Sequence, residues 1–156
     1  MLRRLKARGA EREELLDIYR QQVQSVMELA VPVWHPGLTH AESKQIERVQ
    51  RTALHIIIGS EYTSYKQALN TLNLKPLSVR REDVCLKFAK QALKSPKFSK
   101  WFSKNANHSP TMETRGSKPL LKPIQTRTAR YENSTIPYLT ELLNNCTWTK
   151  YEQMFM

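Results

Sequence analysis

Apolar residues recur at intervals of three and four along most of this chain, and this spacing limits its fold more than any other feature. The clearest stretch runs from about Glu11 to Ala30, where acidic and amide side chains occupy the face opposite the apolar one. A period of 3.6 residues is that of an α-helix with one buried side. The expected buried face consists of Leu15, Tyr19, Val23, Val26, Met27 and Ala30. Pro32 is expected to end this helix, because proline disfavours the α conformation in the residue before it.

A second helix is expected after a turn at residues 32–37. Thr39 and Glu42 have the spacing of a capping box, in which each side chain bonds the other residue's main-chain N–H. Gly59 is expected to stop this helix, because glycine is the usual residue in the left-handed conformation that follows a helix. The buried face of this helix is predicted to hold Ile46, Val49, Ala53, Leu54 and Ile57.

Three shorter periodic segments complete the helical pattern. The first covers about residues 64–73. The second begins with Ser78 as its capping residue and ends near Ser95, and the third runs from its capping residue Ser134 to Asn145. Their expected apolar residues are Tyr65, Ala68, Leu69, Leu72, Cys85, Leu86, Phe88, Ala89, Ala92, Leu93, Leu139, Leu142 and Leu143. No stretch alternates as a strand does. The sequence therefore predicts an all-α, multi-helical bundle of about five to six helices.

Residues 105–133 differ in composition from the rest of the chain. They are rich in Asn, Ser, Thr, Pro and cationic residues and contain few large apolar groups. Such a segment cannot bury enough apolar surface to offset the entropy of ordering it. The predicted organisation is therefore a helical region over 1–104, an extended basic linker over 105–133, and a C-terminal helix and tail over 134–156.

The charge of the chain is concentrated in one part of it. The net charge is +11, and residues 75–130 hold 14 Lys and Arg against 3 Asp and Glu. An excess of this kind is typical of proteins that bind a polyanion. We expect RNA or an RNA–DNA duplex, bound through its phosphates and without sequence readout. The candidate contacts are Lys44, Arg48, Arg51, Arg80, Lys87, Lys90, Lys94, Lys97, Lys100, Arg127 and Arg130.

Two sets of these candidate residues recur at helical spacing. Lys44, Arg48 and Arg51, with His55, fall within about 60° on the predicted solvent face of the second helix. A second stripe on one side of the later helix consists of Arg80, Lys87, Lys90 and Lys94, and Lys97, Lys100 and Lys104 follow it. Trp34, Trp101 and Tyr131 could also stack on bases, although packing between helices is the role we expect for them.

Residues that would carry catalysis or bind metal do not form a recognisable pattern. The only aspartates are Asp17 and Asp83, and the histidines and the cysteines Cys85 and Cys146 do not have the short spacing of a zinc site. Cys85 is expected to be a small core residue. No phosphate-binding loop motif occurs. We therefore expect no enzyme activity and neither cofactor nor metal. Without a signal peptide or a long apolar run, an intracellular location, cytoplasmic or nuclear, is expected and no membrane partner.

Several short runs follow one another in an order that carries a family likeness. They are Leu15–Tyr19, Val23–Ala30, Pro32–Pro36, Ile46–Arg51, Arg80–Glu82, Cys85–Phe88, Arg127–Thr128, Arg130–Tyr131 and Ser134–Asn144. In this order they resemble the region behind the catalytic palm of non-LTR retrotransposon reverse transcriptases, and most closely the jockey-like group of LINE elements. The resemblance covers about residues 2–146.

The resemblance implies a helical thumb followed by a post-thumb C-terminal region. In this family such a thumb holds the template–primer duplex against the palm, whose paired metal-binding aspartates have no counterpart here. The expected function is thus that of a non-catalytic fragment of an RNA-directed DNA polymerase that supports nucleic acid, with a separate palm domain as a further expected partner. Two alternatives stay open, namely a helical protein-interaction module and a non-functional retroelement relic.

Overall fold

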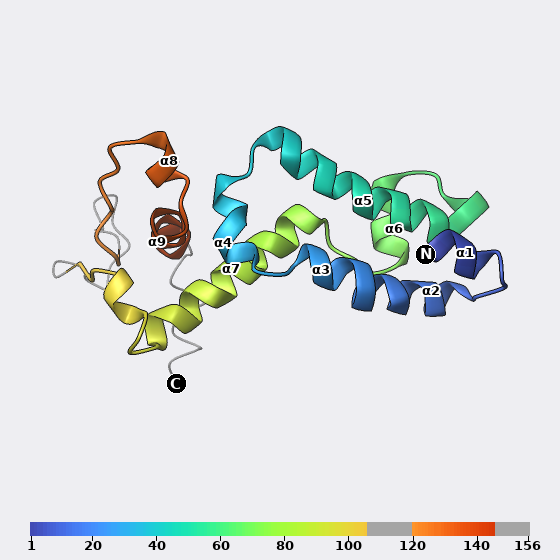
Figure 1. Cartoon of the computed structure of the whole chain (residues 1–156), viewed down its shortest axis with the longest axis horizontal. Coiled ribbons are helices and arrows are strands. Elements are labelled where there is room, and N and C mark those ends of the chain that lie inside the picture. Colours follow the sequence, from blue (N-terminus) through green and yellow to red (C-terminus); the bar gives the residue numbers. More distant parts are fainter. Residues whose placement is uncertain (106–119, 146–156) are drawn as a thin grey trace. The chain divides into compact units, whose positions relative to one another are not determined.

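A computed structural model describes residues 1–105 and 120–145 and confirms the predicted all-α, multi-helical fold (Figure 1). Within these two ranges no β-strand forms, and one isolated bridge pairs Lys104 with Leu121. The chain packs as two compact units, residues 1–31 with 38–83 and residues 32–37 with 84 onward. The long helix α7, Leu77–Lys94, contributes residues to both. The domain boundaries expected at 104 and 133 stay predictions.

The first unit is built from short helices around the long helix α5. Its elements are α1 (Leu2–Lys6), α2 (Arg12–Ile18), the π-helical segment η1 (Tyr19–Gln24), α3 (Ser25–Met27), α5 (His40–Ile58), the 3-10 turn η3 (Gly59–Glu61), α6 (Tyr65–Thr71) and the start of α7. The sequence pattern missed α1. The core of this unit consists of Leu2, Leu15, Tyr19, Ala53, Leu54, Ile57, Ile58, Ala68, Leu69 and Leu72.

The π-helical segment overturns part of the face predicted for residues 11–30. A π turn holds one more residue than an α turn, because its hydrogen bonds run from i to i+5. Each residue advances about 100° around a helix, so the extra residue rotates everything after it. Leu15 and Tyr19 precede the shift and are buried as predicted, whereas Gln24 is buried and Val26 is 69% exposed. The predicted burial of Val26 is therefore wrong.

The end of this helix and the link after it also differ from the prediction. The helix ends at Met27, before Pro32, and Ala30 takes a positive φ of 51°. Residues 31–34 then form the short helix α4 (Val31–Trp34), followed by the 3-10 turn η2 (His35–Gly37). Proline in the first turn of a helix loses no main-chain bond, because the N–H groups there have no helical partner. The predicted simple turn at 32–37 is thus a pair of short helical turns.

Both ends of α5 follow the prediction. The Thr39 side chain accepts the Glu42 N–H at 3.3 Å, and the Glu42 carboxylate accepts the Thr39 N–H at 2.8 Å, which is the expected capping box. At the other end Gly59 has a φ of 74°. The Lys6 ammonium donates to the carbonyls of Ile56 and Ile57. A cation at this end of a helix is favourable because the last carbonyls have no helical partner and carry partial negative charge. Val49, predicted to be buried, is 46% exposed.

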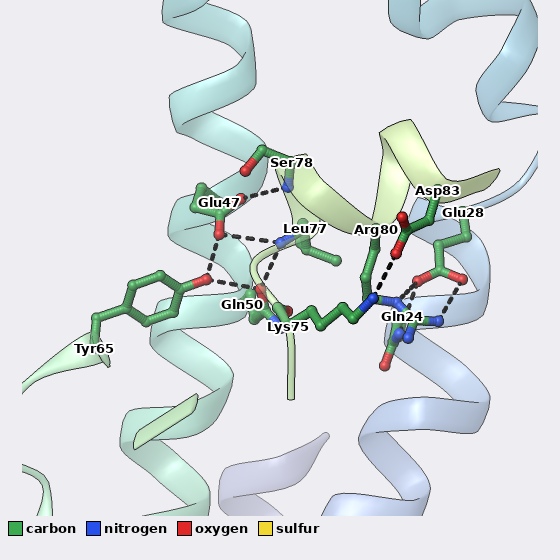
Figure 2. Close-up of polar contacts among 10 residues, drawn as sticks. All are labelled: Gln24, Glu28, Glu47, Gln50, Tyr65, Lys75, Leu77, Ser78, Arg80 and Asp83. Atoms are coloured by element: carbon green, nitrogen blue, oxygen red, sulfur yellow. Dashed lines mark hydrogen bonds and ion pairs between the residues drawn. The ribbon is translucent and has the colours of Figure 1, made fainter. Parts of the chain in front are cut away.

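The start of α7 is capped by side chains from α5. Glu47 accepts the N–H groups of Leu77 and Ser78 at 3.2 and 3.3 Å, and Gln50 accepts the Leu77 N–H at 3.2 Å (Figure 2). On their other side both side chains accept a hydrogen bond from the Tyr65 hydroxyl, where burial and then Glu47 raise the pKa of the phenol. The prediction that Ser78 caps this helix is wrong, because Ser78 lies inside the first turn.

The second unit contains the rest of α7, the 3-10 turn η4 (Ser99–Trp101), α8 (Ala129–Glu132) and α9 (Thr135–Asn145). Its buried residues include Cys85, as predicted, and Ala89, Ala92, Phe102, Leu121, Leu139 and Leu143. Within this unit α9 packs on η2, where the rings of His35 and Tyr138 meet edge to face with centroids 5.6 Å apart.

The expected extended linker over 105–133 is only partly observed. Residues 106–119 lie outside the described part of the chain. Leu121 is fully buried, and the Asn144 side chain accepts its N–H at 2.9 Å and donates to its carbonyl at 3.1 Å. Residues 129–132 form α8, capped by the Thr128 side chain. Residues 129–132 are thus helical and not extended, and Leu121 gains order from tertiary bonds that local composition does not show.

Candidate nucleic-acid interface

The predicted stripe on α5 lies on the solvent side of the helix. Lys44, Arg48, Arg51 and His55 are all exposed. The Arg51 guanidinium lies over the Tyr65 ring, 5.2 Å from its centroid, which is a cation–π geometry. This contact fixes Arg51 near Tyr65 while its polar edge stays accessible. The stripe is therefore placed as predicted, and its binding to phosphate stays a prediction.

Arg48 also borders an open groove. The groove has a volume of about 480 Å³ and runs between α1 and α5. Its lining residues on α5 recur at helical spacing, Gln45, Arg48, Val49, Thr52, Ala53 and Ile56, and Met1, Leu2, Arg3 and Val23 complete it. Arg48 thus separates a cationic stripe from a largely apolar one on the same helix.

Arg80 is paired with a carboxylate and adds no unneutralised charge to the predicted stripe, and its contact with phosphate stays a prediction. Its guanidinium forms an ion pair with Glu28, donating through Nε and, at 3.0 Å, through Nη2 (Figure 2). Gln24 donates a further bond to Glu28 at 2.7 Å. Burial of Glu28 raises its pKa, but the bonds from Arg80 and Gln24 and the charge of Arg80 outweigh burial and hold the pKa below its ordinary value. Arg80 stabilises the first unit.

The second unit carries the lysines of α7 and of the turn that follows. Lys87, Lys94, Lys97 and Lys100 are exposed, and Lys90 is half-buried. The described residues place no carboxylate within ion-pair distance of Lys87, Lys97 or Lys100. Because Lys87, Lys90 and Lys94 are three and four residues apart, they share one face of α7.

Arg127 and Arg130 also belong to the second unit. Both are exposed, Arg127 before α8 and Arg130 within it. Over the described part of this unit there are nine lysine and arginine residues and two glutamates, Glu132 and Glu141. The described part of the first unit holds thirteen cationic and ten acidic residues. The positive charge seen in the sequence is thus carried by the second unit, and ion pairs such as Lys75–Asp83 and Arg12–Glu61 lie in the first.

Three aromatic side chains of the second unit are exposed, and for two of them, Trp101 and Tyr131, the sequence predicts a role in packing between helices. Phe98, Trp101 and Tyr131 are 38%, 37% and 44% exposed, whereas Trp34 is half-buried. The rings of Phe98 and Trp101 lie with their centroids 4.7 Å apart. The sequence signal for this pair is the spacing of three residues from Phe98 to Trp101, which favours adjacent side chains in a tight turn.

The buried position of Arg81 was not predicted from the sequence. Its side chain is buried and donates to the Ser43 hydroxyl at 2.6 Å. The signal was available, because Arg81 falls four residues after Leu77 and four before Cys85, on the buried face of α7. A buried arginine of this kind organises the packing between α5 and α7, so we do not count it among the phosphate contacts.

Comparisons with known proteins give no relative from which a function could be inferred. A scan against protein-family models, a search of curated proteins and a search of solved structures each found no match. Among residues 1–105 and 120–145 no three His, Cys, Asp or Glu side chains gather as metal ligands, and Cys146 lies outside these ranges. No described helix has the length and apolarity needed to cross a membrane. The likeness to reverse transcriptases stays a prediction.

Proposed function

We propose that this chain is a non-catalytic nucleic-acid-binding module that supports a template–primer strand through phosphate contacts of its second unit. The observation that carries the proposal is the charge of that unit, nine cations against two carboxylates over its described residues. Crowded like charges destabilise a folded unit, and a polyanion compensates for them. Each cation that neutralises a phosphate also releases condensed counterions, which favours binding.

The spacing of the lysines suits a nucleic-acid backbone. Lys87 and Lys94 are separated by seven residues of α7, which is about 10 Å along a helix axis. This span matches about three nucleotide steps of 3.4 Å along one strand. Lys97 and Lys100 continue the series beyond the end of α7. Such contacts position a strand without reading its bases.

The test is the salt dependence of binding to an RNA–DNA hybrid, measured by fluorescence anisotropy. Affinity is expected to fall steeply with salt, with a slope of about −0.9 for each phosphate contact on a logarithmic plot. Replacing Lys87, Lys97 and Lys100 by Gln should reduce that slope by about 3. The matched control replaces Arg4, Arg8 and Lys66 by Gln, three exposed cations of the first unit. No binding at low salt, or an equal effect of both sets, contradicts the proposal.

The ancestry of the module is a separate part of the proposal. The ordered likeness of residues 2–146 to the thumb and post-thumb region supports an origin in a LINE-type reverse transcriptase, and the all-α fold is compatible with it. In that case a palm domain is the natural protein partner, and the module works where RNA and DNA are found, in the cytoplasm or the nucleus. Translation of the genomic DNA upstream tests this origin, since an unrelated upstream sequence counts against it.

A second candidate function is that of a helical protein-interaction module. The groove between α1 and α5 favours it, because its apolar lining is unusual for a solvent-facing helix surface. Its apolar residues on α5, Val49, Ala53 and Ile56, lie at i, i+4 and i+7 and so form one stripe for a partner helix. Sedimentation equilibrium over a hundredfold concentration range tests self-association through this face. A species that stays monomeric throughout contradicts pairing of two copies.

A further inference from the structure

We infer that Phe98 and Trp101 form a stacking platform for an unpaired base, so that the second unit holds single-stranded nucleic acid in preference to a duplex. This inference rests on the proposed function, because it names the form of nucleic acid that the same basic unit takes. The observation behind it is a pair of exposed rings, Phe98 and Trp101, each directly preceded in the sequence by an exposed lysine.

The main chain holds the two rings side by side. After α7 ends at Lys94, the Phe98 N–H donates to the Ser95 carbonyl at 3.1 Å and the Trp101 N–H donates to the Phe98 carbonyl at 2.9 Å. These i to i+3 bonds produce a 3-10 turn, in which residues three apart lie on the same side. Phe98 and Trp101 therefore share a side, with ring centroids 4.7 Å apart and planes inclined by 51°.

The following residue anchors the turn to the unit. Phe102 is 5% exposed, whereas Phe98 and Trp101 are 38% and 37% exposed. One aromatic residue thus supplies the burial that this short turn requires, and the other two leave part of their rings to solvent. Exposing two neighbouring rings forgoes the free energy that their burial would release, which is expected where a surface serves to bind.

The lysines beside the rings indicate what stacks on them. Lys97 and Lys100 are both exposed, and each directly precedes one of the two rings in the chain, so both cations lie close to the rings along the backbone. Cations beside aromatic faces are the combination that binds single strands, since the cations hold phosphates and the rings hold bases. Bases in a duplex are stacked on their neighbours and offer no free face, so a duplex can use only the lysines.

The test uses a chain in which Trp101 is the only tryptophan, with Trp34→Phe and Trp148→Phe. Its emission is followed during titration with a single-stranded oligo-uridine and with an RNA hairpin of equal phosphate number. We expect the single strand to quench Trp101 and the hairpin to bind without quenching. In the otherwise native chain, Trp101→Ala should weaken single-strand binding by about 5- to 150-fold, as one lost stacking contact does, and change hairpin binding less than twofold.

Trp101→Phe provides the matched variant, because it keeps an aromatic face and should restore most of the single-strand affinity. A urea melt of each variant establishes that the unit is folded. Equal binding of both ligands with unchanged Trp101 emission overturns this inference and leaves the phosphate-binding proposal standing. Failure of both ligands to bind at low salt overturns the proposed function and this inference together.

Discussion

The carboxylate of Glu47 accepts the main-chain N–H of Leu77 at 3.2 Å, so that one helix caps another from thirty residues away. The same carboxylate accepts the Ser78 N–H and the Tyr65 hydroxyl, and α5, α6 and α7 therefore meet at a single side chain (Figure 2). The first N–H groups of a helix have no partner within it, and a negative group there also suits the helix dipole. Glu47 is thus central to the polar packing of the first unit.

Replacing Glu47 by Ala is expected to lower the free energy of unfolding by about 2 kcal/mol, because the Ser78 N–H loses its acceptor and the Leu77 N–H keeps only Gln50. Urea denaturation followed by circular dichroism measures this. The control is Glu61→Ala, which removes an exposed ion pair with Arg12 and should cost less than about 1 kcal/mol. Similar losses for the two variants would contradict a capping role for Glu47.

Stability should fall in acid through Glu28. Its pKa is lowered in the folded chain, although burial opposes the effect of Arg80 and Gln24. The unfolded chain, with the ordinary pKa of 4.5, therefore takes up the proton first as the pH falls. The stability that Glu28 contributes is complete above that pH and is lost as the pH falls towards the folded pKa.

The measurement for Glu28 compares the native chain with Glu28→Gln in urea between about pH 6 and pH 3. The difference in unfolding free energy is expected to be constant near neutrality and to shrink below the ordinary pKa of the carboxyl. Glu13→Gln, at an exposed position on α2, is the control. A difference between the native chain and Glu28→Gln that does not change over this range would sink the ion-pair explanation.

Gly59→Ala is expected to destabilise the chain by about 1–3 kcal/mol, because a φ of 74° is strained for any residue with a side chain. A methyl group there would also lie 2.5 Å from the Lys6 ammonium that binds the end of α5. Gly37→Ala is the matched control, since its methyl group would meet only the Asn133 carbonyl at an ordinary 3.8 Å. Thermal unfolding that ranks Gly37→Ala as the more damaging change would refute the assignment.

Asn144→Ala should release the main chain at Leu121, because the amide both accepts its N–H and donates to its carbonyl. Hydrogen exchange of peptides covering residues 120–124 should become at least about tenfold faster, equivalent to about 1.4 kcal/mol for the lost bonds. Asn145→Ala, one residue on and exposed, should leave this exchange unchanged. Unaltered protection in Asn144→Ala would show that other contacts hold Leu121.

Much of the helical framework could be predicted because its signals are local. Thr39 and Glu42 are three residues apart, so the capping box at the start of α5 depends only on neighbouring residues. Gly59 ends α5 because glycine can take a positive φ. The predicted face of residues 11–30 is confirmed at Leu15 and Tyr19 and in part at Val23 and Met27, which pack against the core, but not at Val26. The periodicity of the sequence contains no sign of the π turn, which exposes Val26 and buries Gln24.

The sequence by itself determined where α2, α5, α6 and α9 begin, that helices pack through one apolar side, and that cationic residues gather in residues 75–130. Only the tertiary structure decided which of these cations are available, because Arg80 meets Glu28 across fifty-two residues whereas Lys97 and Lys100 meet no carboxylate among the described residues. The physical reason is the separation along the chain over which each interaction acts. Helix propensity and capping act between residues a few positions apart, while neutralisation of a charge or burial of Leu121 depends on which distant segments the folded backbone brings within hydrogen-bonding distance.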